Sequence, residues 1–173
     1  MIDVVCKSQY GTTRTYRITV NRSTTDTGFE LNELQTNNTY INGFSIGDTV
    51  STAVGRMIID SERGVIKILN SAKQEKPGDA LICTGDYVDV CKLDGTVDME
   101  YPVVLYGDVN GDGKADLFDY AIIKKHCWSG GQTLGGIGLE AANVYPASQD
   151  VDIFDMAVFK KYMWGSGAIS QRR

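Results

Sequence analysis

The chain has 173 residues, of which 42% are hydrophobic and 23% are charged, the composition of an ordinary globular protein. The net charge of −5 argues against a nucleic-acid partner, because no basic stripe interleaved with aromatic residues accompanies it. No run of about 18 apolar residues is present, so we expect no membrane span.

The cysteines and the start of the chain bear on the cellular compartment. The four cysteines, Cys6, Cys83, Cys91 and Cys127, show no CxxC spacing, so we do not expect zinc. Cys83 and Cys91 are candidates for a bridge between neighbouring strands, and buried free thiols are the alternative. Met1 is not followed by the charged region and long apolar run of a signal peptide. We therefore expect the C-terminal piece of a longer secreted protein, extracellular or attached to the cell surface.

The first 22 residues have the pattern of a β-hairpin. Tyr16, Ile18 and Val20 alternate with polar neighbours, as in a half-buried strand. Residues 4–7 are expected to form the partner strand, and residues 9–12 the turn between them.

A polar, turn-rich stretch at residues 23–35 predicts a loop or linker before the next β-rich part. Residues 40–106 contain β-branched and aromatic runs, with turns at residues 84–86 and 94–96 and a short helix at residues 49–57. The expected strands are residues 40–44, 65–69, 80–83, 87–91 and 97–105. Short strands at this spacing predict an all-β, Ig-like sandwich.

An alternating row of acidic and amide residues occupies residues 108–119. Side-chain oxygens fall at loop positions 1, 3, 5, 9 and 12, a glycine at position 6, and a free backbone carbonyl at position 7. Calcium takes roughly six to eight oxygen ligands, and the glycine allows the sharp turn between them. The predicted ligands are Asp108, Asn110, Asp112, Lys114 through its carbonyl, Asp116 directly or through water, and Asp119. The alternative is a turn rich in Asp, Asn and Gly that binds no metal.

The loop is flanked by a predicted strand and a predicted helix. Residues 101–106 are β-rich and contain a proline, so the entering helix of a full EF-hand is missing. Residues 117–128 predict a helix with an apolar stripe on one face and lysines on another. Residues 153–164 repeat this helix, with Phe, Asp, Ala, Lys-Lys and Trp at the same places. The duplication predicts two loop–helix units related by a pseudo-twofold axis.

The tandem loop–helix units resemble a dockerin, the calcium-dependent module by which secreted polysaccharide-degrading proteins attach to cohesin domains of a scaffoldin. The resemblance covers residues 107–173 and implies a small α-helical domain with two calcium-binding loop–helix motifs. The preceding part is similar to the Ig-like or X-type modules that often stand before a dockerin. The implied domains are therefore residues 1–106, with residues 1–22 as a hairpin that completes or precedes the sandwich, and residues 107–173.

The second loop departs from the pattern of the first. Asn143, Val144 and Tyr145 stand where the first loop has Asp-Val-Asn, the central glycine is gone, a proline is present and one residue is inserted. Two interpretations stay open: either an altered ligand set holds calcium, or the loop folds without metal and packing holds its helix. The altered set would be Asn143, Asp150, Asp152 and Asp155.

The resemblance also implies which residues contact a cohesin. In dockerins these residues cluster at loop positions 10 and 11 and farther along the exit helix. The corresponding residues are Leu117, Phe118, Ala121, Ile122, Lys124 and Lys125 in the first unit, and Ile153, Phe154, Ala157, Lys160 and Lys161 in the second. Apolar pairs flanked by charge suit a tight interface.

Each of these residue types has a plainer interpretation. Phe118 and Phe154 are alternatively core residues that pack the two helices together. The lysine pairs are alternatively a solvated helix face. We expect Trp128 and Trp164, which close the helices, to pack on each other or to clasp the ends of the domain.

The sequence offers no catalytic constellation and no small-molecule substrate. The carboxylates of residues 1–106 fall at turns or on the solvent side of predicted strands, the usual place for such groups, so we expect a non-catalytic protein. A second hypothesis is carbohydrate binding by the sandwich, with a dockerin-like tail in which calcium is purely structural. Sugar platforms need exposed Trp or Tyr side chains, yet both tryptophans lie in the tail.

Overall fold

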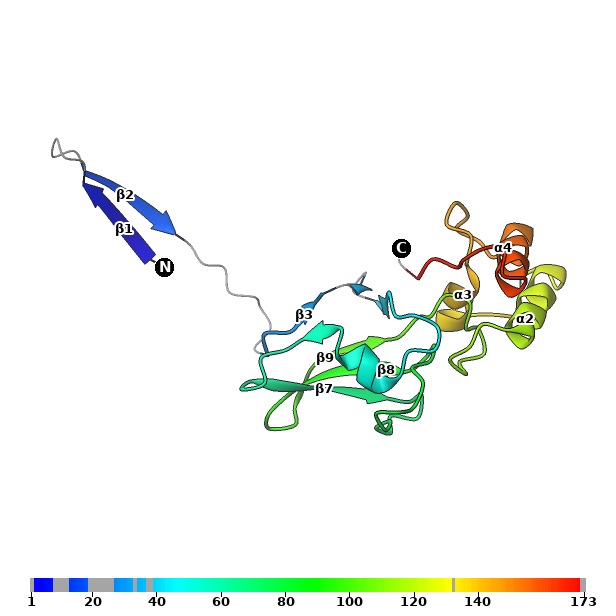
Figure 1. Cartoon of the computed structure of the whole chain (residues 1–173), viewed down its shortest axis with the longest axis horizontal. Coiled ribbons are helices and arrows are strands. Elements are labelled where there is room, and N and C mark those ends of the chain that lie inside the picture. Colours follow the sequence, from blue (N-terminus) through cyan, green and yellow to red (C-terminus); the bar gives the residue numbers. More distant parts are fainter. Residues whose placement is uncertain are drawn as a thin grey trace.

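The computed structural model describes residues 2–7, 13–18, 27–32, 34–36, 39–131 and 133–171. Three helices lie together at one end of the molecule, and a β-rich part lies next to them (Figure 1). No helix within the described residues is long and apolar enough to cross a membrane.

The predicted N-terminal hairpin is present. Strands β1 (Ile2–Lys7) and β2 (Thr13–Ile18) pair antiparallel, with Ile2 opposite Ile18 and Lys7 opposite Thr13. The turn predicted at residues 9–12 and residues 23–26 of the predicted linker lie outside the described residues.

The largest sheet of the described chain has three antiparallel strands in the order β7-β8-β9. Strands β7 (Gly64–Leu69), β8 (Tyr87–Lys92) and β9 (Val97–Pro102) correspond to three of the predicted strands. The alternating residues Ile66 and Ile68 of β7 are buried, as the period-2 pattern requires.

The remaining strands of the β-rich part are only two residues long. Strand β3 (Glu30–Leu31) pairs with β6 (Met57–Ile58), and β4 (Gln35–Thr36) pairs with β5 (Ile41–Asn42). Helix α1 (Val50–Val54) lies within the helix predicted at residues 49–57. Its start is fixed by a capping box, in which Thr49 and Thr52 each accept a backbone N–H of the other.

The predicted strand at residues 80–83 does not form. Backbone groups of this segment bond to the start of α1 instead, where Val50 donates to the carbonyl of Ala80 and Ile82 donates to the carbonyl of Asp48. Leu81 makes only an isolated bridge with Thr49. The segment therefore covers α1 and does not extend a sheet.

The predicted fold class, an Ig-like sandwich followed by a two-helix dockerin domain, is wrong. A sandwich needs two sheets stacked face to face, whereas the described strands form four separate sheets of two or three strands. The C-terminal part has a third helix, α3 (Gly136–Ala142), between α2 (Leu117–Trp128) and α4 (Ile153–Met163). Its core also takes in Val104 and Tyr106, so α2 and α4 do not form a self-contained pair.

Two hydrophobic cores meet along residues 103–106. Val103 and Leu105 pack into the core of the β-rich part, and Val104 and Tyr106 pack into the core of the helices. Successive side chains of an extended segment point to opposite sides, so this one segment serves both cores. The first loop begins directly after it, and its position is therefore fixed by both parts.

The end of the described chain returns to the same segment. The side-chain amide of Gln171 donates to the carbonyl of Tyr106 and accepts the Tyr106 N–H, at 2.7 and 2.9 Å. Ile169 is buried in the helical core, close to Gly107 and Phe159. Helices α2 and α4 pack against each other within this closure.

Candidate metal centre and helix surface

The first loop is organised around the buried carboxylate of Asp108. Its Oδ1 accepts the N–H groups of Gly111 and Asp112, and its Oδ2 accepts those of Gly113 and Thr84. Asp108 is fully buried. Three of the four donors belong to the loop itself, so this one side chain draws the loop into a closed turn.

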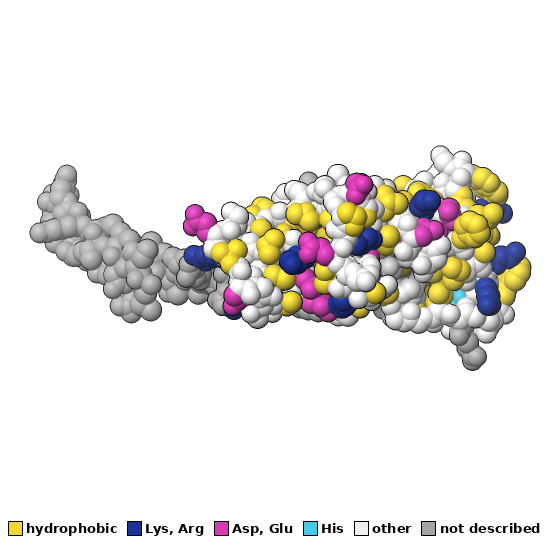
Figure 2. All heavy atoms as spheres, turned by 90° about the horizontal axis from the view of Figure 1, so that it is seen from below, with side chains coloured by type: hydrophobic (Ala, Val, Ile, Leu, Met, Phe, Trp, Pro, Cys, Tyr) yellow, Lys and Arg dark blue, Asp and Glu magenta, His cyan; other side chains and the backbone are white. Residues whose placement is uncertain are grey.

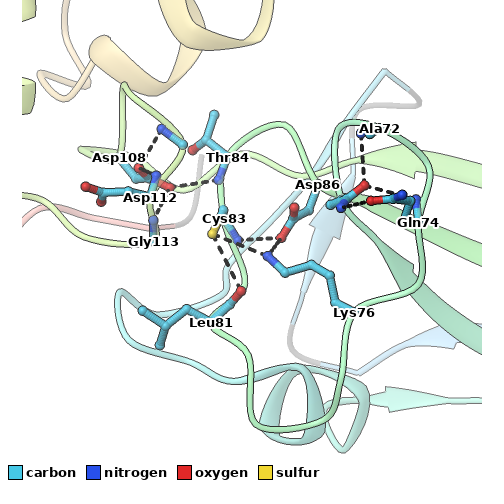
Figure 3. A network of polar contacts seen from close by, with 12 residues as sticks. Ala72, Gln74, Lys76, Leu81, Cys83, Thr84, Asp86, Asp108, Asp112 and Gly113 are labelled. Atoms are coloured by element: carbon cyan, nitrogen blue, oxygen red, sulfur yellow. Dashed lines mark hydrogen bonds and ion pairs between the residues drawn. The ribbon is translucent and has the colours of Figure 1, made fainter.

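The fourth donor, Thr84, joins the loop to the β-rich part (Figure 3). Next to it, the N–H of Cys83 donates to Asp86, and the Lys76 ammonium lies 2.6 Å from the same carboxylate and 3.4 Å from the Cys83 sulfur. Burial opposes the charge of Lys76, but the hydrogen bond and charge of Asp86 outweigh it and raise the pKa of Lys76. This network holds the Thr84 N–H toward Asp108.

The closing residue of the first loop, Asp119, is also fully buried. Its Oδ1 accepts the N–H groups of Val109 and Asn110, and its Oδ2 accepts the N–H of Asp116. The Asp116 carboxylate in turn accepts the N–H groups of Phe118 and Asp119, and the bond from Asp119 completes the capping box of α2. The loop therefore ends in the first turn of the helix without a break.

Two glycines of the loop lie too close to the β-rich part to carry a side chain. Gly111 and Gly113 have φ angles of +77° and +80°. A Cβ atom would lie 2.8 Å from the Thr84 carbonyl oxygen at Gly111 and 3.0 Å from the Ile82 carbonyl oxygen at Gly113. Glycine at these places permits both the left-handed turn and the close approach.

The donor set of the first loop fits a hard cation. Burial raises the pKa of Asp108 to about 6, although the N–H groups bonded to it act in the opposite direction, and the charge of Asp119 adds to the rise. Burial likewise raises the pKa of Asp119. None of the ion pairs between described residues involves either carboxylate. A divalent cation would compensate two buried charges that no basic side chain compensates.

Of the other predicted ligands, Asn110, Asp112 and Lys114 are exposed and Asp116 is partly buried. The Asn110 side chain accepts the N–H of Asp112, and the Asp112 side chain accepts the N–H of Lys114. Within the described residues, no group of three or more His, Cys, Asp or Glu side chains is close enough to hold a metal. The predicted ligands of the first loop also include the Asn110 amide and the Lys114 backbone carbonyl, which are not among those four residue types. Calcium binding by this loop stays a prediction.

The second loop brings its predicted ligands together only in part. Asp155 is fully buried, Asn143 is buried, Asp152 caps α4 and Asp150 is exposed. The Asp155 carboxylate accepts the N–H groups of Tyr145 and Asp152, which matches the role of Asp119 in the first loop. Asn143 bonds to backbone carbonyls.

Of the two interpretations of the cysteines, the structure has the free thiols: Cys83, Cys91 and Cys127 are not in disulfides.

Most of the predicted contact residues lie on the solvent side of α2 and α4. Phe118 is 71% exposed and Phe154 is 56% exposed, with its ring 5.4 Å from that of Tyr145. Neither phenylalanine therefore fills the space between the helices. Ile122 is partly buried against the helical core, and Lys124 is partly buried too. The exposed members of the set are Leu117, Phe118, Ala121, Lys125, Ile153, Phe154, Ala157, Lys160 and Lys161.

Sequence reasoning assigned the two tryptophans to packing, but they lie on the surface. Trp128 and Trp164 are 74% and 70% exposed. Lys124 lies over the Trp128 ring and Lys160 over the Trp164 ring, at 4.3 and 4.6 Å from the ring centroids. The four-residue spacing of Lys and Trp on one helix was the available signal. Figure 2 shows hydrophobic and basic side chains side by side at the helical end.

Two open hollows adjoin Trp128. One of about 540 Å³ lies where the end of α2 meets the start of α4, lined by Cys127, Trp128, Ile153 and Met156 among others. The other, of about 430 Å³, is lined by Ala121, Lys124, Lys125, Trp128 and Ser129. The apolar surface is thus hollowed as well as exposed.

Comparisons with known proteins found no match to this chain among family models, curated proteins or solved structures.

Proposed function

We propose that the chain is a non-catalytic, calcium-dependent protein–protein interaction module. Its partner is a cohesin of a scaffoldin or cell-surface complex, and its role is to attach a secreted polysaccharide-degrading or -binding protein to that complex. The proposal takes the partner class from the resemblance of the two loop–helix units to those of dockerins. It does not depend on the fold of the preceding part.

The observation that carries the proposal is an apolar surface repeated on α2 and α4. Six large apolar side chains on these helices are more than half exposed, although the domain is small and has a core to fill. They are Leu117, Phe118, Trp128, Ile153, Phe154 and Trp164. Lys124 and Lys160 lie over the two tryptophan rings, and basic side chains lie next to hydrophobic ones at the helical end (Figure 2), a mixture of apolar and charged groups that suits a protein interface.

Calcium enters the proposal through the start of α2. The buried Asp119 both closes the first loop and forms the capping box of the helix, and Leu117 and Phe118 occupy the two positions before it. An ion that fixes the carboxylates of Asp108 and Asp119 would therefore fix the first turn of the helix and its exposed apolar pair.

A carbohydrate partner has less support on this surface. Sugars stack on open aromatic faces, and one face of each exposed tryptophan is covered by a lysine ammonium. In the β-rich part, the Lys73 ammonium lies 3.0 Å from the ring centroid of Tyr87, and Tyr101 packs on Phe29. These rings are engaged within the protein.

The experiment is binding to an immobilised panel of cohesins, with calcium and with a chelator. We expect at least one cohesin to bind in calcium and to be released by the chelator. The double variant Phe118→Asp/Phe154→Asp should weaken binding at least about thirtyfold, the effect of losing one interface hot spot. Leu93→Asp is the matched control, because Leu93 is 66% exposed in the turn after β8. Failure of every cohesin to bind, or binding that survives chelation, would contradict the proposal.

A further inference from the structure

The two helices start in the same way. Asp116 and Asp152, the N-cap residues, have φ angles of −135° and −138° and the same ψ angle of −165°. The side chain of each accepts the N–H two residues on, and the backbone N–H of each donates to the carboxylate of Asp119 or Asp155. The second unit therefore reaches the helix geometry of the first despite its altered loop.

The two loops differ at the buried side chain that begins them. Asp108 presents two carboxylate oxygens to four backbone N–H groups. Asn143 presents its side-chain N–H group to the carbonyls of Ser148 and Gln149, at 3.4 and 3.1 Å. The backbone of the second turn thus directs two acceptors, the carbonyls of Ser148 and Gln149, at the amide nitrogen of Asn143, and a neutral amide closes the turn.

The other positions of the second loop do not restore a set of oxygen ligands. Tyr145 stands where Asn110 stands in the first loop, and its ring packs on Phe154. Ala147 offers no side-chain oxygen. The Ser148 hydroxyl donates to the carbonyl of Asp150 at 2.8 Å, so the turn is tied by its own groups. The second loop keeps three carboxylates, Asp150, Asp152 and Asp155, against four in the first loop. With no carboxylate or amide at its third and fifth positions, it does not supply the set of roughly six to eight oxygens that calcium takes.

We infer that the second loop is closed by Asn143 and takes no calcium. Only the first unit is then ordered by the ion. The surface of α4, with Ile153, Phe154 and Trp164, stays formed at low calcium, whereas the start of α2 becomes loose. This inference rests on the proposed function only in taking calcium as the ion of the first loop.

Calorimetric titration of the whole chain with calcium tests the inference. We expect the unmodified chain to bind one calcium ion and Asp108→Ala to bind none. Asn143→Ala should still bind one ion, with its Kd changed by less than about threefold, because an amide that bonds to backbone carbonyls does not contribute to calcium affinity. Asp150→Asn, a substitution at an exposed position, gives the same information if Asn143→Ala fails to fold. Two ions per chain, or the loss of one ion in either second-loop variant, would overturn the inference.

Hydrogen exchange of four matched amides provides the second test. The N–H groups of Asn110 and Asp116 bond to Asp119, and those of Tyr145 and Asp152 bond to Asp155. Calcium should slow exchange of the first pair at least about tenfold more than that of the second. Equal slowing of both pairs would overturn the inference. Neither measurement involves a cohesin, so both can be interpreted even if no cohesin binds the chain.

Discussion

The two loop–helix units share a helix start and differ in how the loop before it is closed. Asp119 and Asp155 occupy the same place, are fully buried, and hold the loop backbone against the first turn of the helix. At the first loop position one unit has the Asp108 carboxylate and the other has the Asn143 amide. The comparison indicates that the capping box positions the helix in both units, and that the units differ at the buried side chain, carboxylate or amide, that begins the loop.

Replacing Asp119 or Asp155 by alanine should have the largest effect on stability. Each carboxylate accepts buried backbone N–H groups and belongs to a capping box, so its loss leaves donors without partners. We expect each variant to lose about 3 kcal/mol in free energy of unfolding without calcium. At a hundredfold excess of calcium over Kd, Asp119→Ala should also lose the stabilisation of about 2.7 kcal/mol that the ion gives the unmodified chain.

Urea unfolding of both variants, with calcium and with a chelator, checks this prediction. Asp155→Ala should keep the calcium-dependent gain that Asp119→Ala loses. If both variants lost the gain equally, the distinction between the two loops would be wrong. Leu93→Asp, in an exposed turn, controls for a general effect of substitution.

The central glycine of the first loop, Gly113, which has no counterpart in the second loop, should give the next largest effect. Gly113→Ala forces a side chain into the left-handed region and brings its Cβ within 3.0 Å of Leu81 and of the Ile82 carbonyl oxygen. We expect it to lower the free energy of unfolding by about 2 kcal/mol and to weaken calcium binding. Gly130→Ala is the matched control, because its φ is +72° but no atom lies within 4 Å, so it should lose only about 1 kcal/mol. Thermal unfolding of the two variants separates contact from backbone strain, and equal losses would show that the contact is unimportant.

The features that sequence predicted well are those encoded within one segment. Helix α2 has the predicted bounds, since the Asp116 and Asp119 side chains that cap its start lie within the segment itself. Its apolar residues do not share one buried face, because Phe118 is exposed and Ile123 is buried. The predicted strand at residues 80–83 has the right residue types, but Pro77 and Gly78 precede it, and its backbone bonds to α1. Whether a β-prone run joins a sheet depends on distant partners, which one sequence does not reveal. The Ig-like sandwich was an inference of that kind.

Two parts of the helical region carried no usable signal. Helix α3 contains Gly136 and Gly138, which disfavour a helix, and its position is secured by burial of Ala141 and Ala142 in the helical core. The Thr84 N–H that bonds to Asp108 is a backbone group, and every residue except proline has one. Because this donor lies 24 positions from Asp108, its hydrogen bond could not be predicted from the sequence.

The two exposed phenylalanines should differ in their contribution to stability. Phe118 is 71% exposed, so Phe118→Ser should change the free energy of unfolding by less than about 0.5 kcal/mol. Phe154 packs on Tyr145 of the second loop, so Phe154→Ser should lose about 1 kcal/mol. Urea unfolding in calcium measures both. A large loss in Phe118→Ser would mean that this side chain belongs to the core and is not free to contact a partner.

A comparably small effect, of the opposite sign, is expected at a buried aspartate outside both units. Asp89 of β8 is buried like Asp119 and Asp155, but its Oδ1 has no hydrogen-bond partner within the described chain. Burial, with the charge of Glu100 opposite it on β9, raises the pKa of Asp89. The folded protein therefore binds this proton more tightly than the unfolded chain does, and the stability due to protonation is lost as pH rises through the raised pKa.

Asp89→Asn should accordingly stabilise the protein at neutral pH, by about 0.5 kcal/mol, since an amide carries no charge and can donate to Glu100. The gain should disappear as pH falls below the raised pKa, where the carboxyl group is already neutral. Asp155→Asn is the matched control and should destabilise, because an amide nitrogen would replace an oxygen that accepts backbone N–H groups. Unfolding curves at neutral and at acid pH measure the free energy of unfolding of both variants. If Asp89→Asn also lowered this free energy at neutral pH, the missing hydrogen bonds of the Asp89 carboxylate would not be what makes it costly. The contrast between hydrogen-bonded and unbonded buried carboxylates would then be wrong.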